Sequence, residues 1–286
     1  MTRVLLIGCG DIALRTAAML RGRARLYGLV RNPARAEALR AAGMVPVLGD
    51  LDDRRSLARL AGLADAVLHF APPPNAGDCD PRTRHLLAAL SRGTLPARLV
   101  YISTSGVYGD CGGAWVEETH PLHPANARAL RRVDAERQIR DWATTGGVHA
   151  VILRVPGIYA ADRLPLERIR QGTPAIRDAE DSYTNHIHAD DLARIAVAAL
   201  QHGKPNRVYH ASDDSQLKMG AYFDAVAAAY GLPYPPRLPR AEVQRSVSPM
   251  LWSFMNESRR LGNARLKREL RVQLRYPDVA AGLAAL

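Results

Sequence analysis

The chain has 286 residues, 47% of them hydrophobic and 23% charged, a composition ordinary for a soluble globular protein with a sizeable core. Its formal net charge of +11 attracts anions such as phosphorylated cofactors and would equally attract nucleic acid. We expect no nucleic-acid partner, because aromatic residues are only 6% of the chain, the arginines are scattered and no nucleic-acid-binding module is recognisable.

The cysteines and the apolar runs indicate in which cellular compartment the protein is expected. Cys9, Cys79 and Cys111 are too few and too far apart for a zinc site or a disulfide framework, which favours a reducing compartment and predicts a cytoplasmic protein. The apolar run before Cys9 is too short for a signal peptide, and no stretch reaches the length of a membrane span. We therefore expect no membrane partner.

Short apolar runs alternate with helical patterns over the first two thirds of the chain. Strands are expected at residues 4–7, 25–30, 45–48, 66–70, 99–103 and 150–155, helices at 13–20, 33–42, 54–62, 82–90 and 125–144, and a strand running into a helix at 187–200. Parallel neighbours need crossover connections, so this order predicts an α/β fold with a doubly wound parallel sheet, the Rossmann fold.

The last third has a proline-rich stretch at residues 232–238 and then short helices without strand alternation. This change predicts a smaller C-terminal substrate domain. We assign residues 1–158 and 187–205 to the dinucleotide-binding domain, and 159–186 and 206–286 to the substrate-binding domain.

The segment GCGDIA at residues 8–13 matches the G-x-G-x-x-[GA] turn that follows a strand and opens a helix. There, backbone N–H groups and the helix dipole meet a pyrophosphate. We expect Gly8, Gly10, Asp11 and Ile12 to bind a dinucleotide, against the alternative that the turn is purely structural.

The residues at the end of the second expected strand indicate which dinucleotide is bound. An acidic residue there binds the ribose 2′-hydroxyl of NAD, whereas arginine suits the 2′-phosphate of NADP, and this chain has Arg31 and Asn32. NADP(H) is therefore the expected cofactor and NAD(H) the second choice, unless Arg31 is merely solvated. Asp50, followed by Leu51, is placed to accept a hydrogen bond from adenine or, alternatively, to cap a helix.

Three segments carry a resemblance to a known family. Residues 103–109 (STSGVYG), 153–159 (LRVPGIY) and 186–193 (HIHADDLA), together with Asp50, resemble motifs of the extended short-chain dehydrogenase/reductase superfamily, which includes sugar-nucleotide epimerases and dehydratases. The resemblance covers about residues 3–200 and more weakly the rest. It implies that Thr104, or its neighbour Ser105, holds the substrate oxygen, unless these hydroxyls only cap a loop. Further cofactor contacts are expected from Ala71, Pro72, Thr104, Arg132, Pro156 and Ile158.

The proton donor of that superfamily is the tyrosine of Y-x-x-x-K. When the glutamate after this motif is aligned with Glu136, Arg128 takes the tyrosine position and Arg132 the lysine position. A guanidinium is no useful acid, so Arg128 cannot replace the phenol, although Arg132 could hold the cofactor ribose or an anionic substrate group. The alternative is a solvated face of Arg128, Arg131 and Arg132, with Arg132 paired to Glu136.

Another group must then move the proton, if chemistry occurs. Tyr108 and Tyr159 follow strands at the edge where doubly wound sheets bind ligands, and Tyr183 and His186 are further candidates, each of which could instead be structural. His188, Asp190 and Asp191 lie close to His186, but no further ligand completes a metal site, and the aspartates are read as helix N-caps.

These features predict an NADP(H)-dependent oxidoreductase, or an epimerase/dehydratase-like enzyme, with a proton donor other than the usual tyrosine. The substrate is an unidentified small carbonyl, alcohol or sugar nucleotide that could be anionic. The alternative is a catalytically silent NADP(H)-binding redox sensor or scaffold. By resemblance we also expect a homodimer formed through the helices at residues 81–90 and 125–142.

Overall fold

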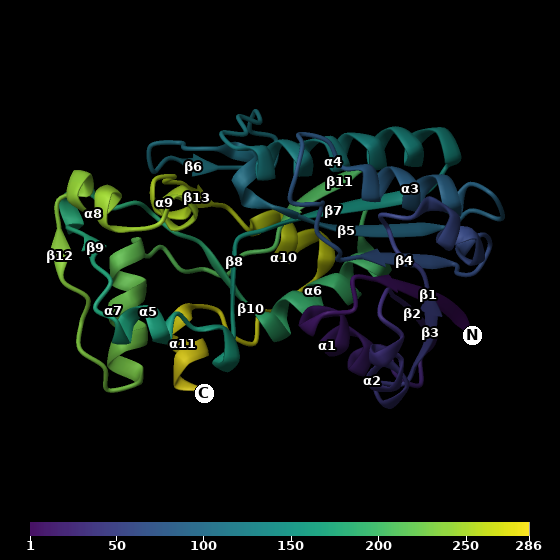
Figure 1. Ribbon diagram of the computed structural model, residues 1–286, viewed down its shortest axis with the longest axis horizontal. Coiled ribbons are helices and arrows are strands. Elements are labelled where there is room, and N and C mark those ends of the chain that lie inside the picture. Colours follow the sequence, from purple (N-terminus) through teal and green to yellow (C-terminus); the bar gives the residue numbers. More distant parts are fainter. Residues whose placement is uncertain (286) are drawn as a thin grey trace.

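A parallel sheet of seven strands forms the centre of the computed structural model, which describes residues 1–285 (Figure 1). The strand order is β11-β7-β5-β4-β1-β2-β3. The strands are β1 (Thr2–Ile7), β2 (Ala24–Val30), β3 (Met44–Leu48), β4 (Ala66–His69), β5 (Arg98–Thr104), β7 (His149–Val155) and β11 (Arg207–His210). The order reverses at β1, where the chain passes from one half of the sheet to the other, and such a point is the usual ligand site of this fold.

Both faces of the sheet are buried. In β1, Val4 and Leu6 belong to one apolar core, whereas Leu5 and Ile7 belong to the other, because successive side chains of a strand point to opposite faces. A strand covered on both sides therefore reads as a continuous apolar run. The first core is covered by α1 (Asp11–Leu20), α2 (Ala36–Ala41), α6 (Ala189–His202) and α10 (Ala264–Leu270), and the second by η2 (Arg54–Leu60), α3 (Pro81–Leu90) and α4 (Ala127–Gly146).

A smaller lobe stands beyond the carboxyl ends of the strands (Figure 1). Its apolar core includes Tyr159 and Phe223. The lobe contains α5 (Leu166–Arg170), β9 (Ala175–Ile176), α7 (Met219–Ala229), β12 (Arg237–Leu238), α8 (Arg240–Ser246), α9 (Pro249–Met255) and α11 (Val279–Ala284). Short parallel pairs connect it to the sheet: β8 (Gly157–Tyr159) with β10 (His186–His188), and β6 (Trp115–Val116) with β13 (Arg260–Leu261). Single 3-10 turns are η1 (Pro33–Arg35), η3 (Ser105–Tyr108), η4 (Ala161–Arg163) and η5 (Asp178–Glu180).

The predicted fold class is confirmed, and several elements differ in detail. The helix expected at 33–42 is the 3-10 turn η1 followed by α2. The stretch at 54–62, expected as an α-helix, is the 3-10 helix η2. Strand β11 was not predicted, and it pairs with β7 in the main sheet although residues 206–286 were assigned to the substrate domain. Residues 207–210 read RVYH, and two apolar residues between an arginine and a histidine do not form the apolar run by which the other strands were recognised. Among residues 1–285, no helix has the length and apolar character that a bilayer crossing requires.

Candidate functional site

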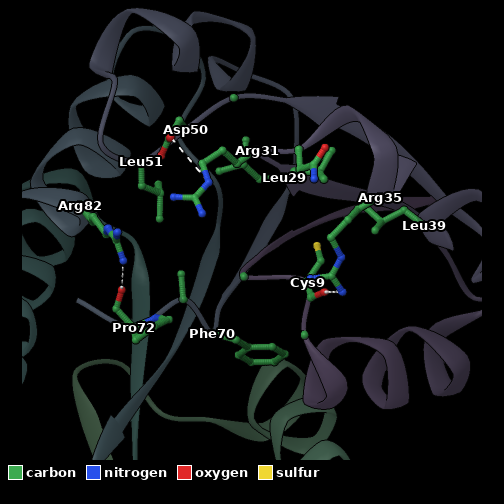
Figure 2. A pocket seen from close by; sticks show the side chains of 16 residues that line it. Cys9, Leu29, Arg31, Arg35, Leu39, Asp50, Leu51, Phe70, Pro72 and Arg82 are labelled. Atoms are coloured by element: carbon green, nitrogen blue, oxygen red, sulfur yellow. Dashed lines mark hydrogen bonds and ion pairs between the residues drawn. The ribbon is translucent and has the colours of Figure 1, made fainter. Parts of the chain in front are cut away.

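The first cavity has a volume of about 470 Å³ and lies at the carboxyl ends of β1, β2, β3 and β4 (Figure 2). Four consecutive strands of one parallel sheet contribute to it, because their carboxyl ends meet at the same edge. Its lining residues are Gly8, Cys9 and Gly10 after β1, Leu29, Val30, Arg31, Asn32, Arg35 and Leu39 from β2 and the segment after it, Gly49, Asp50 and Leu51 after β3, Phe70, Ala71 and Pro72 after β4, and Arg82 of α3.

The glycine turn lies at the N-terminus of α1. Gly8 has φ +86°, and a Cβ there would stand 2.4 Å from the backbone nitrogen of Ala71, so only glycine fits. Gly10 caps α1 without a side chain, and a Cβ at Gly10 would meet nothing within 4 Å. The first amides of α1 are therefore free to bind an anion in the cavity. The two residues that follow, Asp11 and Ile12, do not line it: Asp11 binds Arg15, with Nε–Oδ1 2.8 Å, and Ile12 is buried.

Three arginines, Arg31, Arg35 and Arg82, line the first cavity (Figure 2). Arg31 is 71% exposed, and its Nε lies 3.9 Å from Asp50 Oδ2. Arg35 Nη2 donates to the carbonyl of Cys9 at 3.5 Å. Arg82 Nη1 donates to the carbonyl of Pro72 at 3.2 Å. Arg35 and Arg82 were not predicted from the sequence; Arg35 lies four residues after Arg31, a spacing that could have indicated it.

Asp50 and Asn32, two polar residues that follow strands, differ in whether they cap a helix. Asp50 does not cap η2, since that helix is capped by Asp53, whose side chain accepts the N–H of Arg55. Asp50 Oδ1 instead accepts the N–H of Asp52 at 3.0 Å, and its carboxylate lines the cavity. Asn32 caps η1 through the N–H of Ala34 and lines the cavity as well.

The second cavity has a volume of about 510 Å³ and lies between the sheet and the smaller lobe. Thr104, Ser105, Pro156 and Ile158 line it from the sheet side. Thr104 Oγ1 accepts the N–H of Gly106 at 3.2 Å, so the predicted capping role is present together with the position on the cavity. Other lining residues include Asn126, Arg128, Arg163, Arg168, Tyr183, His186, Met219, Tyr222, Phe223, Leu251, Ser253, Phe254, Glu257 and Arg259.

Two predicted proton donors, Tyr108 and Tyr159, are outside the linings of both cavities. The Tyr108 hydroxyl lies 2.6 Å from Nε2 of His210 and accepts from Nη1 of Arg154 at 2.6 Å, and burial raises its pKa to about 12. The Tyr159 hydroxyl donates to the carbonyl of Asp278 at 3.1 Å, and burial raises its pKa too. Their positions favour a structural role for both.

Arg128, Arg131 and Arg132 of α4 do not form one solvated face, which corrects that alternative, because only Arg128 of the three is exposed. Arg131 is 7% exposed and donates to the carbonyl of Gly77. Arg132 donates to the carbonyl of Ile102 at 2.6 Å and does not pair with Glu136. Arg132 is also absent from the linings of both cavities, so only Arg128 of the three reaches the second cavity.

The histidines of β10 have different surroundings. His186 lines the second cavity, stacks on Tyr222 with ring centroids 4.0 Å apart, and burial lowers its pKa to about 3, so the imidazole is neutral. His188 caps α6 by accepting the N–H of Asp190. Asp191 accepts the N–H groups of residues 275 and 276, so neither aspartate is the N-cap that the sequence suggested. Within residues 1–285 no group of three or more His, Cys, Asp or Glu side chains is arranged to hold a metal ion.

The comparisons with known proteins agree with this geometry. The dTDP-glucose 4,6-dehydratase of Mycobacterium tuberculosis (strain CDC 1551 / Oshkosh) is 26% identical over 194 residues, which cover 59% of this chain and 57% of that protein. The chain thus spans less than two thirds of the length of this relative. Protein YeeZ of Escherichia coli (strain K12) is 25% identical over 97% of both chains. A functionally unknown conserved protein from Silicibacter pomeroyi DSS has a solved structure with a TM-score of 0.82 and 31% identity, covering 100% of this chain and 98% of that one.

A family model also matches residues 13–212, which begin inside α1 and include the carboxyl ends of β2, β3, β4, β5 and β7 and the strand β10, whereas the glycine turn lies just before the match. This match confirms the resemblance to epimerases and dehydratases of the short-chain superfamily. The chain belongs to the NAD dependent epimerase/dehydratase family.

Proposed function

We propose that this chain binds NADP(H) in the first cavity and exchanges hydride with a small carbonyl or alcohol substrate in the second. The observation that carries the proposal is the glycine turn, whose free helix amides face a cavity flanked by Arg31 and Arg35. Backbone amides at a helix N-terminus suit the diphosphate that both pyridine dinucleotides share. The reaction type follows from the family, and the substrate is inferred from the lining of the second cavity.

The preference for NADP(H) rests on charge at the end of β2. Arg31 and Arg35 line the cavity there, and both guanidinium groups suit the 2′-phosphate. Asp50, the nearby carboxylate, follows β3 instead and lies 3.9 Å from Arg31. A 2′-phosphate would be attracted by both arginines, whereas the 2′-hydroxyl of NADH would leave them unused.

Thr104, Pro156 and Ile158 are the proposed contacts for the nicotinamide end, because they line the second cavity from the sheet side. Thr104 would hold the substrate oxygen. Tyr183 is the remaining candidate donor among the phenols named from the sequence, since it lines this cavity and the hydroxyls of Tyr108 and Tyr159 are engaged elsewhere. A Tyr183→Phe variant that keeps full turnover would remove it from the mechanism.

A catalytically silent coenzyme-binding protein is the second candidate. It is favoured by Arg128, which stands at the aligned position of the proton-donating tyrosine and cannot release a proton usefully. A panel of carbonyl and alcohol substrates followed at the nicotinamide absorbance band separates the two. Tight NADPH binding without any turnover would favour the silent protein, and hydride exchange with one substrate would exclude it.

Fluorescence titration with NADPH and NADH tests the coenzyme assignment. We expect NADPH to bind at least about tenfold more tightly, a difference of about 1.4 kcal/mol. Arg31→Gln and Arg35→Gln should each weaken NADPH several-fold and leave NADH unchanged. The matched control is Arg40→Gln, since Arg40 is exposed on α2 and does not line the cavity. Equal affinity for the two coenzymes would overturn the preference.

A homodimer through α3 and α4 is also proposed, by analogy with the superfamily. An elution volume that matches one chain in size-exclusion chromatography would contradict it.

A further inference from the structure

Four arginines line the second cavity, and they fall into two pairs by their partners. Arg163 Nε lies 3.4 Å from Asp11 Oδ2, and Arg259 Nη1 lies 2.9 Å from Glu257 Oε2. Arg128 and Arg168 have no carboxylate within 4 Å among residues 1–285. In the described part of the chain neither guanidinium thus has an ion-pair partner, and Glu257, which pairs with Arg259, is the lining carboxylate whose charge acts on Arg128.

Arg168 is the more enclosed of the unpaired two. Its guanidinium carbon lies 4.1 Å from the centre of the Phe223 ring, and its only hydrogen bond in the described residues is a weak one, from Nη2 to the thioether sulfur of Met255 at 3.3 Å. Its Nε is shielded from solvent and has no hydrogen-bond partner there. Burial lowers the pKa of Arg168 to about 10. A shielded charge without a counter-charge is costly, so the site is incomplete as it stands.

Arg128, on α4, also lies over an aromatic ring that lines the cavity. Its guanidinium carbon lies 4.2 Å from the centre of the Phe254 ring, and Nη2 donates to Oγ of Ser253 at 3.3 Å. Stacking on an aromatic ring occupies the flat face of a guanidinium and leaves its in-plane N–H donors available. Those donors match the oxygens of a carboxylate or a phosphate.

The rest of the lining indicates the body of the ligand. Met219, Tyr222, Phe223 and Leu251 line the same cavity, so an apolar or aromatic body would be covered by apolar side chains while its charged end meets the arginines. The paired arginines, Arg163 and Arg259, already have a carboxylate partner and are not needed for this contact.

We propose that Arg128 and Arg168 form an anion subsite for a small molecule that carries a carboxylate or phosphate on an apolar or aromatic body. Calling this molecule the substrate rests on the proposed function; the subsite itself does not. Arg132, which the sequence suggested for an anionic group, is engaged by Ile102 and cannot serve this cavity without leaving it.

Calorimetric titration tests the subsite with three probes: benzoate, phenyl phosphate and the neutral benzamide. Each is titrated into the full chain with and without NADPH. We expect at least one anion to bind, benzamide to bind at least tenfold more weakly, and Arg128→Gln and Arg168→Gln each to weaken the anion about tenfold. The anion that binds more tightly, benzoate or phenyl phosphate, indicates whether the natural ligand carries a carboxylate or a phosphate. The matched control is Arg170→Gln, an exposed arginine two residues further on α5 that does not line the cavity.

Three outcomes would overturn the subsite: no binding of either anion, equal binding of benzamide, or an equal loss in Arg170→Gln. NADPH titrations of the same variants distinguish this failure from that of the proposed function. Arg128 and Arg168 do not line the first cavity, and they are not among the residues proposed to contact the nicotinamide end (Thr104, Pro156 and Ile158), so their variants should keep the parent affinity for NADPH. If the parent binds no coenzyme, the proposed function fails, and the titration without NADPH still decides the subsite.

Thermal unfolding gives a second readout that a structural arginine would not produce. Arg168→Met keeps much of the side-chain volume and removes the unpaired charge, so the free protein should melt roughly 2 °C higher or more. The stabilisation that the bound anion gives to the parent should be lost in this variant. A lower melting temperature for Arg168→Met would mean that Arg168 is structural, and the proposal would fail.

Discussion

Glu136 of α4 and Arg154 of β7 form a buried ion pair, with Oε2–Nη2 2.7 Å and only 3% and 4% of the two side chains exposed. The Ser103 hydroxyl of β5 donates to the same carboxylate at 2.6 Å, so α4, β5 and β7 are connected through the side chain of Glu136. Although burial opposes it, the hydrogen bond and the charge of Glu136 raise the pKa of Arg154. The pair holds α4, which carries Arg128, against the strands that end at the second cavity.

Glu136→Gln should therefore destabilise the chain strongly. Removing one member of a buried pair leaves the other charge uncompensated, at a cost of about 3–5 kcal/mol. Urea unfolding followed by circular dichroism measures the loss. Asp65→Asn is the comparison, because Asp65 pairs with Arg3 where both side chains are more than 40% exposed, and its loss should be much smaller. Equal losses would mean that burial does not determine the contribution of these pairs.

Tyr108→Phe separates structure from catalysis at a residue that the sequence marked as a proton donor. The change leaves Nε2 of His210 without its 2.6 Å partner inside the core, so we expect a loss of about 1–3 kcal/mol in stability. NADPH affinity should not change, since Tyr108 does not line the first cavity. Tyr230→Phe serves as the exposed control. A variant with full stability but no turnover would restore Tyr108 as the donor.

Local patterns indicated the lining of the first cavity more fully than that of the second, for a physical reason. The glycine turn, Arg31 and Asp50 each follow a strand, and strand ends of a parallel sheet converge wherever the strands are recognised. The state of Tyr108 depends on Arg154 and His210, which lie 46 and 102 residues away in the chain. Contacts between residues so far apart in the chain leave no local sequence pattern. The same holds for Arg168, because the Phe223 ring that it contacts belongs to another helix.

Asp213 should make the stability depend on pH between about 4 and 7. The side chain is 4% exposed, its Oδ2 has no hydrogen-bond partner among residues 1–285, and burial raises its pKa to about 7 from an ordinary value of 3.8. In that window the folded chain keeps a proton that the unfolded chain has lost. The contribution of Asp213 to stability is thus fully present below pH 4 and falls as the pH rises toward 7.

Asp213→Asn removes this dependence. The stability of the variant relative to the parent should increase from pH 4 to pH 7 by on the order of 3 kcal/mol, and stay constant above that range. Urea unfolding at a series of pH values measures the difference, which cancels the other titrating groups. Asp214→Asn, at the exposed neighbour, should run parallel to the parent. A difference between Asp213→Asn and the parent that does not vary with pH would show that Asp213 is ionised in the folded chain.

Gly10→Ala tests whether backbone amides of the turn contact the coenzyme. Gly10 has φ −91°, and a Cβ there meets nothing within 4 Å, so the fold accommodates alanine with little change in melting temperature. A diphosphate that approaches the turn closely would meet the new methyl group, and NADPH affinity should fall at least tenfold. Gly8→Ala provides the contrast, because its Cβ would stand 2.4 Å from the backbone nitrogen of Ala71 at φ +86°. That variant should lose stability as well as binding, whereas unchanged NADPH affinity in a well-folded Gly10→Ala would place the diphosphate away from the turn.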